Sequence, residues 1–143
     1  MSSAISRLLP APRLREVDRV AVAAPPADAW SVVREADLYA LRFVRALFDL
    51  RTLPERAGKL LRGERADPAP RRARLDDIVG ETSSFRRLAE VPGREFVAGA
   101  IGKFWKVNIP FVEASPETFR AFAEPGFGKV AWSLEVHPRV GGG

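Results

Sequence analysis

The stretch EFVAGAIGKFW, Glu95–Trp105, decides how the sequence folds. It places a run of small and apolar residues, with glycines at 99 and 102, between a charged start and an aromatic end. Its apolar part is far shorter than the roughly 20 residues that cross a bilayer. Pro92 and Gly93 precede it and supply the fixed φ and the positive φ of a type II turn. We therefore predict that residues 83–105 form a β-hairpin.

The pairing within this hairpin determines which side chains share a face. With a two-residue turn, Glu90 would face Glu95 and Ala89 would face Phe96. One face would then carry small residues in the middle and aromatic rings at its ends, namely Phe85, Ala89, Phe96, Ala98, Ala100 and Phe104. This profile is typical of a cavity floor. Two alternatives are that the small residues let a helix pack closely, or that the glycines mark a bulge that bends the sheet.

Composition narrows the classes of protein. The chain has 143 residues, 46% hydrophobic and 29% charged, as in one globular domain. It has no cysteine, which excludes disulfides and thiolate metal sites. The net charge of +5 comes mostly from arginines in an Ala-, Gly- and Pro-rich sequence, so we predict no nucleic-acid partner. The start of the chain lacks a sustained apolar stretch and a cleavage site, and we predict no membrane span and a cytoplasmic location.

The first half of the chain predicts one strand followed by helices. Residues 15–24 alternate with β-branched side chains and predict a strand. A helix should start near Pro26, and a second, amphipathic helix should cover residues 36–51 with Phe48 on its apolar face. Residues 52–63 suggest a third helix that opens with a capping box. The proline- and arginine-rich residues 64–74 predict a surface loop.

The second half returns to strands. After the hairpin, Ser115 and Pro116 predict the N-cap and first residue of a short helix. Residues 129–136 predict a last strand with alternate residues on one face, namely Val130, Trp132, Leu134 and Val136. Helices that are segregated from strands in this way predict an α+β fold with an antiparallel sheet.

The strand leading into APPADAW, the helices before an Arg/Pro loop, LAEVPGREFVAGAIGKFW and EPGFGKVAWSLEV together resemble the START-like, or SRPBCC, superfamily. That group includes polyketide cyclase/dehydrase-like and Bet v 1-like proteins, and the resemblance spans about residues 14 to 138. It implies a helix-grip fold, in which a curved antiparallel sheet wraps a long C-terminal helix over an apolar cavity. It also implies that residues 14–143 form the domain and residues 1–13 an N-terminal extension.

The chain departs from that pattern where it ends. It stops at VHPRVGGG, where similar proteins continue into further strand and the long closing helix. We therefore expect a C-terminally truncated domain that lacks the last strands and that helix. An open sheet edge would follow, with self-association through that edge as one consequence.

Candidate catalytic groups are few. The pair Glu90 and Glu95 could act as acid and base, although an exposed hairpin end relieved by Arg86 and Arg94 is the better explanation. His137 is the only histidine, so no histidine metal site can form, and its position beside a proline near the chain end favours the surface. Tyr39 could donate a proton inside a pocket. We assign no catalytic residue, no metal and no cofactor.

The sequence thus predicts a binding domain for a hydrophobic small molecule or lipid in a cavity between the sheet and the helices, and it favours a non-enzymatic role over an enzymatic one. The predicted ligand-binding residues are Phe48, Phe96, Ala98, Ala100, Phe104, Trp105 and Trp132. Two alternatives stay open. One is a protein-interaction module that uses the open sheet, and the other is a small polyketide cyclase- or lyase-like enzyme.

Overall fold

A computed structural model describes residues 2–37, 56–65, 74–80 and 83–140. The chain forms helices on both sides of one antiparallel sheet, in which four strands take part. The named elements, in chain order, are α1 (Ala4–Leu8), α2 (Pro26–Glu35), α4 (Leu75–Ile78), β1 (Arg86–Val91), β2 (Glu95–Gly102), β3 (Phe111–Val112), α5 (Pro116–Ala121) and β4 (Gly128–Glu135). The predicted α+β class with an antiparallel sheet is confirmed.

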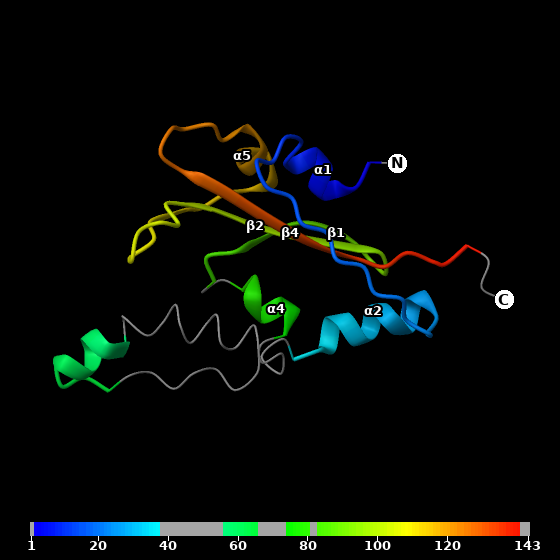
Figure 1. Ribbon diagram of the computed structural model, residues 1–143, viewed down its shortest axis with the longest axis horizontal. Helices are drawn as coiled ribbons and strands as arrows, with labels where there is room; N and C mark the ends of the chain where they lie inside the picture. Colours follow the sequence, from blue (N-terminus) through cyan, green and yellow to red (C-terminus); the bar gives the residue numbers. More distant parts are fainter. Residues whose placement is uncertain (1, 38–55, 66–73, 81–82, 141–143) are drawn as a thin grey trace.

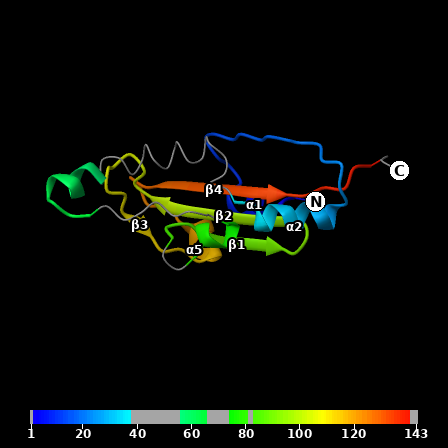
Figure 2. The ribbon, with the colours of Figure 1, turned by 90° about the horizontal axis from the view of Figure 1, so that it is seen from below.

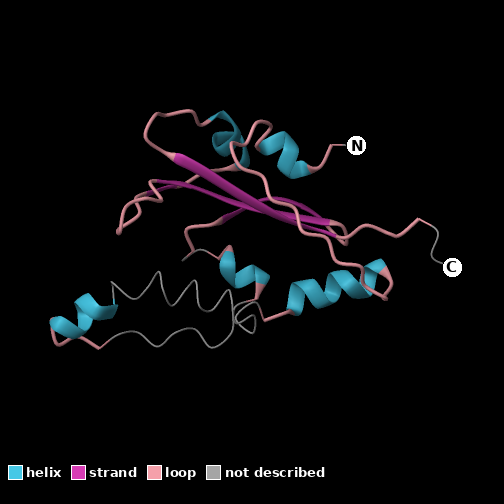
Figure 3. Cartoon of the chain, viewed as in Figure 1, coloured by secondary structure: helices cyan, strands magenta, loops and turns pink. Residues whose placement is uncertain are grey.

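Strand β2 is the centre of the sheet. Along one edge, β2 pairs with β1 over residues 95–99 and with β3 at its last two residues. Along its other edge, β2 pairs with β4 over its full length. All eight residues of β2 are buried. Helices α1 and α5 lie over one face of the sheet, and α2 and α4 lie over the other (Figures 1 and 3). Residues 95–102, the first part of the stretch Glu95–Trp105, therefore form a central strand that is covered on both faces.

The hairpin was predicted correctly, but its register was not. Arg94 donates its backbone N–H to the carbonyl of Val91 at 3.0 Å, and Gly93 has φ of 72°, which agrees with the expected turn. Three residues, not two, separate the paired Val91 and Glu95, so Glu90 faces Phe96. A one-residue change in register moves every side chain to the other face.

An irregularity in β1 then restores part of the expected pattern. The register shifts between Arg87 and Ala89, which pair with Ala98 and Val97. Leu88 is therefore the extra residue of a bulge. The bulge lies in β1 and not, as one of our alternatives had it, at the glycines of β2. Leu88 and Ala89 both pack on the α1/α5 face as a result, so Ala89 does not share a face with Phe96.

The strand predicted for residues 15–24 does not form. Residues 10–28 are exposed and none of them before Pro26 belongs to a helix or strand. Val20 and Val22, which would share one face of that strand, are 85% and 61% exposed. Alternation makes a segment suitable for a sheet, but a strand also needs a partner that pairs with it. This connector leads from α1 on one face to α2 on the other, along the outer side of β4 (Figure 2).

Other predictions are confirmed. Helix α2 begins at Pro26 with Asp28 in its first turn. Helix α5 has Ser115 as its N-cap, whose hydroxyl accepts the Thr118 N–H, and Pro116 as its first residue. In β4, Trp132 and Leu134 face the α2/α4 layer, and Val136 just beyond the strand packs there too. Residues 56–61 are helical, which confirms the described part of the helix predicted for residues 52–63. Residues 38–51 of the helix predicted for 36–51, and residues 66–73 of the loop predicted for 64–74, lie outside the described residues.

Candidate functional site

The α2/α4 face of the sheet holds most of the predicted ligand-binding residues. Phe96 and Ala98 are fully buried there, and Ala100 is 3% exposed. They alternate along β2 with residues that face α1 and α5, so they share one face because of the pleat. Trp132 of β4 lies opposite Ala98 in register, and its ring lies 5.8 Å from that of Phe96, centroid to centroid. These four residues thus form one apolar strip across two strands.

Two helical side chains cover part of this strip. Trp30 of α2 and Leu75 of α4 form a buried cluster with Phe96 and Ala98. At these positions the small alanine lets helical side chains pack directly on the sheet. The cluster does not include Ala100, and Val130, its partner in register, is 41% exposed. The apolar strip therefore continues past the Trp30–Leu75 cluster through the buried Ala100 to Val130, whose side chain is partly exposed.

The remaining predicted site residues lie elsewhere. Phe104 follows β2 and makes an edge contact with Phe111, with ring centroids 6.0 Å apart. Trp105 is 64% exposed, so it does not join the buried strip. Phe48 lies outside the described residues. Sequence reasoning missed Leu75 and Val79, which pack against the strip from α4 and its C-cap, because four helical residues are too few to give a periodic signal.

The two glutamates of the hairpin do not form a pair. Glu90 makes ion pairs with Arg34 of α2 and with Arg87, the latter at 3.0 Å. Glu95 is buried at 8% exposure, and its Oε1 accepts the backbone N–H of Ala4 at 2.7 Å. Each carboxylate thus has its own partners, Glu90 with α2 on one face of the sheet and Glu95 with α1 on the other. The register places neither opposite the other, so the structure does not support the candidate acid–base pair.

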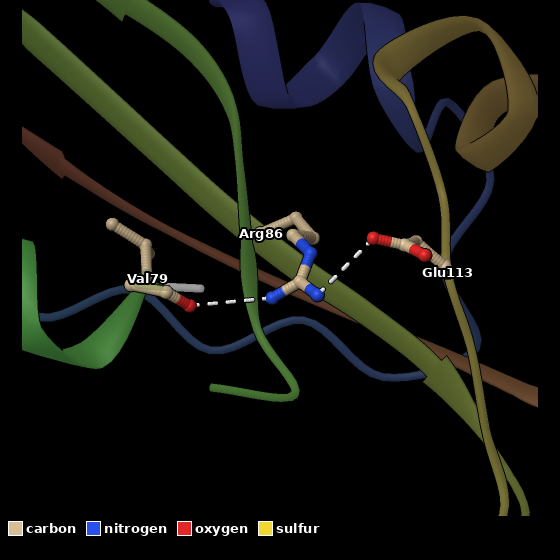
Figure 4. A pocket seen from close by; sticks show the side chains of 4 residues that line it. Val79, Arg86 and Glu113 are labelled. Carbon is tan, nitrogen blue, oxygen red and sulfur yellow. Dashed lines mark hydrogen bonds and ion pairs between the residues drawn. The ribbon is translucent and has the colours of Figure 1, made fainter. Parts of the chain in front are cut away.

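Arg86 also has a different role from the one predicted. It lines a shallow depression of about 350 Å³ together with Val79, Gly80 and Glu113 (Figure 4). Its guanidinium donates to the carbonyl oxygens of Gly80 and Ser83, and it pairs with Glu113 at 3.3 Å. Because these partners already satisfy the cation, the depression offers no unpaired charge to a ligand.

Other candidate chemistry is sparse in the part of the chain that the structure describes. His137 is on the surface and pairs with Glu135 at 2.8 Å. No cluster of three or more potential metal ligands occurs among the described residues. No described helix has both the length and the apolar character that a membrane crossing requires. Tyr39 lies outside the described residues.

The chain matches no protein family, no curated protein and no solved structure. The site therefore has to be interpreted from its own residues.

Proposed function

We propose that the chain binds a hydrophobic small molecule or lipid on the α2/α4 face of its sheet, as a START-like helix-grip domain would. One observation supports the proposal: the apolar strip places the small residues Ala98 and Ala100 beside the Phe96 and Trp132 rings, and it continues to Val130, which is 41% exposed. A small residue in a strand leaves volume above it, and Trp132 beside it offers a large apolar wall. Such a site selects a ligand by shape and apolar area.

The proposal places the ligand at the Ala100–Val130 end of the strip. Trp30 and Leu75 already fill the space above Phe96 and Ala98, so a ligand there would have to displace them. Ala100 does not belong to that cluster, and beside it Val130 is 41% exposed. Phe104, whose ring lies 3.1 Å from the position that a Cβ on Gly128 would take, is close to the same end of the sheet. A cytoplasmic location belongs to the same proposal and would be tested by fractionation of the producing cells.

Substitution of Ala100 by leucine tests this placement. If a ligand occupies the space, the larger side chain fills it, dye or ligand binding falls, and the melting temperature stays level or rises. If the space is already filled by protein, overpacking lowers the free energy of unfolding by about 1–3 kcal/mol. Ala123→Leu, at an exposed alanine after α5, is the matched control. Native mass spectrometry of freshly purified protein then looks for a co-purified ligand. A spectrum that shows only the mass of the chain, without added ligand mass, would count against the proposal.

A second function, a protein-interaction module, is favoured by the outer edge of β4. In the described part of the chain this strand pairs only with β2. The backbone N–H of Val136 donates to the carbonyl of Arg94, just beyond the paired residues of β4 and β2. Hydrogen-bonded pairs alternate along an antiparallel ladder. The even-numbered residues of β4 therefore make the backbone hydrogen bonds to β2. The backbone groups of odd-numbered residues such as Ala131 therefore point outward. They could pair with an extended segment of a partner or with another copy of the chain, once the connector of residues 10–25, which runs along this edge without pairing with it, moves aside.

A proline substitution in β4 tests this second function. Ala131→Pro removes an outward N–H without removing a bond to β2, so it should abolish strand addition and leave the sheet intact. Size-exclusion chromatography over a range of concentrations measures self-association. Equal elution of wild type and Ala131→Pro at every concentration would argue against association through this edge.

A further inference from the structure

The loop between β2 and β3 exposes large apolar side chains at one end of the sheet. Residues 103–110 form this loop, at the end of β2 that is far from the hairpin turn (Figures 1 and 2). Trp105 is 64% exposed and Val107 is 85% exposed. Two large apolar side chains within three residues, both facing solvent, form a local apolar tip, and such tips mark contact surfaces.

The base of the loop is held in place. Phe104 packs against Phe111 of β3 and against Gly128 of β4. The N–H of Lys106 donates to the carbonyl of Lys103 at 3.0 Å, which closes a turn around Phe104 and Trp105. Because its base is packed and its tip is turned, the loop presents Trp105 and Val107 without losing much freedom on binding.

The charges of the loop select an anionic partner. Lys103 and Lys106 flank Trp105, and no aspartate or glutamate occurs from residue 96 to residue 112. The Lys103 ammonium lies over the ring of Phe127, 4.8 Å from its centroid, whereas Lys106 is exposed. Glu113, the first acidic residue after the loop, is paired with Arg86. The tip is therefore apolar and carries positive charge.

We propose that this loop docks on an anionic lipid surface. Tryptophan prefers the boundary between headgroups and acyl chains, because its ring is apolar and its N–H stays hydrated. Val107 would enter the apolar side of the same boundary, and Lys106 would meet the phosphates of the headgroups. A single-stranded nucleic acid fits the loop less well, because two lysines neutralise few phosphates and the aliphatic Val107 gives no stacking surface.

Vesicle binding tests the proposal directly. The purified chain is mixed with vesicles of phosphatidylcholine alone or of phosphatidylcholine with phosphatidylglycerol, and bound protein is measured by sedimentation. Binding is expected only to the anionic vesicles, with a blue shift of tryptophan emission. Trp105 should cause the shift, because Trp30 is buried at 9% exposure and Trp132 is half-buried against Phe96. Trp105→Phe should therefore keep most of the binding and lose most of the shift.

Substitutions in the loop give the decisive comparison. Trp105→Ala should weaken partitioning roughly tenfold or more, and Lys106→Gln about fivefold. Val107→Ser should weaken it about fivefold, while Val20→Ser, at a valine that is also 85% exposed, should leave it unchanged. All four variants change exposed side chains, so their melting temperatures should match the wild type.

Three results would overturn the proposal. The first is no binding to anionic vesicles, and the second is equal weakening by Val20→Ser and Val107→Ser. The third is binding to a single-stranded oligonucleotide but not to vesicles. The outcome is independent of the proposed ligand site, because Ala100→Leu leaves the loop intact and Val107→Ser leaves the apolar strip intact.

Discussion

Glu95 fastens the start of the chain to the central strand. Its carboxylate accepts the N–H of Ala4 at 2.7 Å and the N–H of Ile5 at 3.4 Å, at the first turn of α1. The N-cap residue of that helix, Ser3, makes no side-chain capping bond. Glu95 thus takes the place of an N-cap from 91 residues away in sequence. Its negative charge also suits the positive end of the helix.

Removing this carboxylate should therefore destabilise the protein measurably. Glu95→Ala loses a capping bond worth about 1 kcal/mol and leaves the N–H of Ala4, a residue only 4% exposed, without its partner. Together these losses amount to about 2 kcal/mol. In a domain of this size the melting temperature should fall by about 6 °C. Glu95→Gln keeps an acceptor oxygen but loses the charge, so it should fall by about half as much.

Thermal unfolding followed by circular dichroism measures both variants. Glu124→Gln, at an exposed glutamate in the loop before β4, is the matched control and should melt like the wild type. Hydrogen exchange adds a local readout, because the amides of Ala4 and Ile5 should lose protection in Glu95→Ala before those of β2 do. If Glu95→Ala melted at the wild-type temperature with these amides still protected, the capping role would be refuted.

Three further substitutions test the packing and ion pairs around the sheet. Gly99→Ala would place a Cβ 2.6 Å from Leu88 Cδ1 and 3.0 Å from Phe119 Cε2, so urea unfolding should show a loss of about 1–3 kcal/mol. Phe119→Ala removes a fully buried ring and should cost about 3–5 kcal/mol in the same assay, with Gly99→Ala rescued in the double variant by the space created. Arg34→Met removes a partner of the half-buried Glu90 and should lower the free energy of unfolding by about 1 kcal/mol in thermal unfolding. The difference between wild type and variant should shrink as salt is added, because salt screens the ion pair of the wild type. Two results would contradict these explanations. One is a double variant whose loss of unfolding free energy equals the sum of the two single losses, and the other is an Arg34→Met effect that does not depend on salt.

Local signals predicted the elements that are stabilised locally. The cap at Ser115, the proline at position 26 and the Pro92-Gly93 turn each act within a few residues of their own position, and each was found where the sequence placed it. The apolar face of β4 was predictable for the same reason, because alternation along one strand is local.

What could not be predicted depends on distant partners. Helix α1 has no cap in its own sequence, because its cap is Glu95. The hairpin register depends on a three-residue loop and on the bulge at Leu88, which local pattern does not show. In the candidate site, Phe96, Ala98 and Trp132 were correctly placed on one face, but the covering by Trp30 and Leu75 is a tertiary contact. The exposure of Trp105 likewise follows from the path of the loop.

The link between Ala4 and Glu95 also bears on how the chain is made. The ribosome makes α1 before β2, yet the helix has neither its cap nor its apolar partners until β2 has been synthesised. A helix of five residues does not persist alone in water. Residues 4–8 can therefore dock only when the sheet exists. Contacts of such long sequence separation slow folding, so this segment stays accessible to chaperones and proteases until β2 is in place.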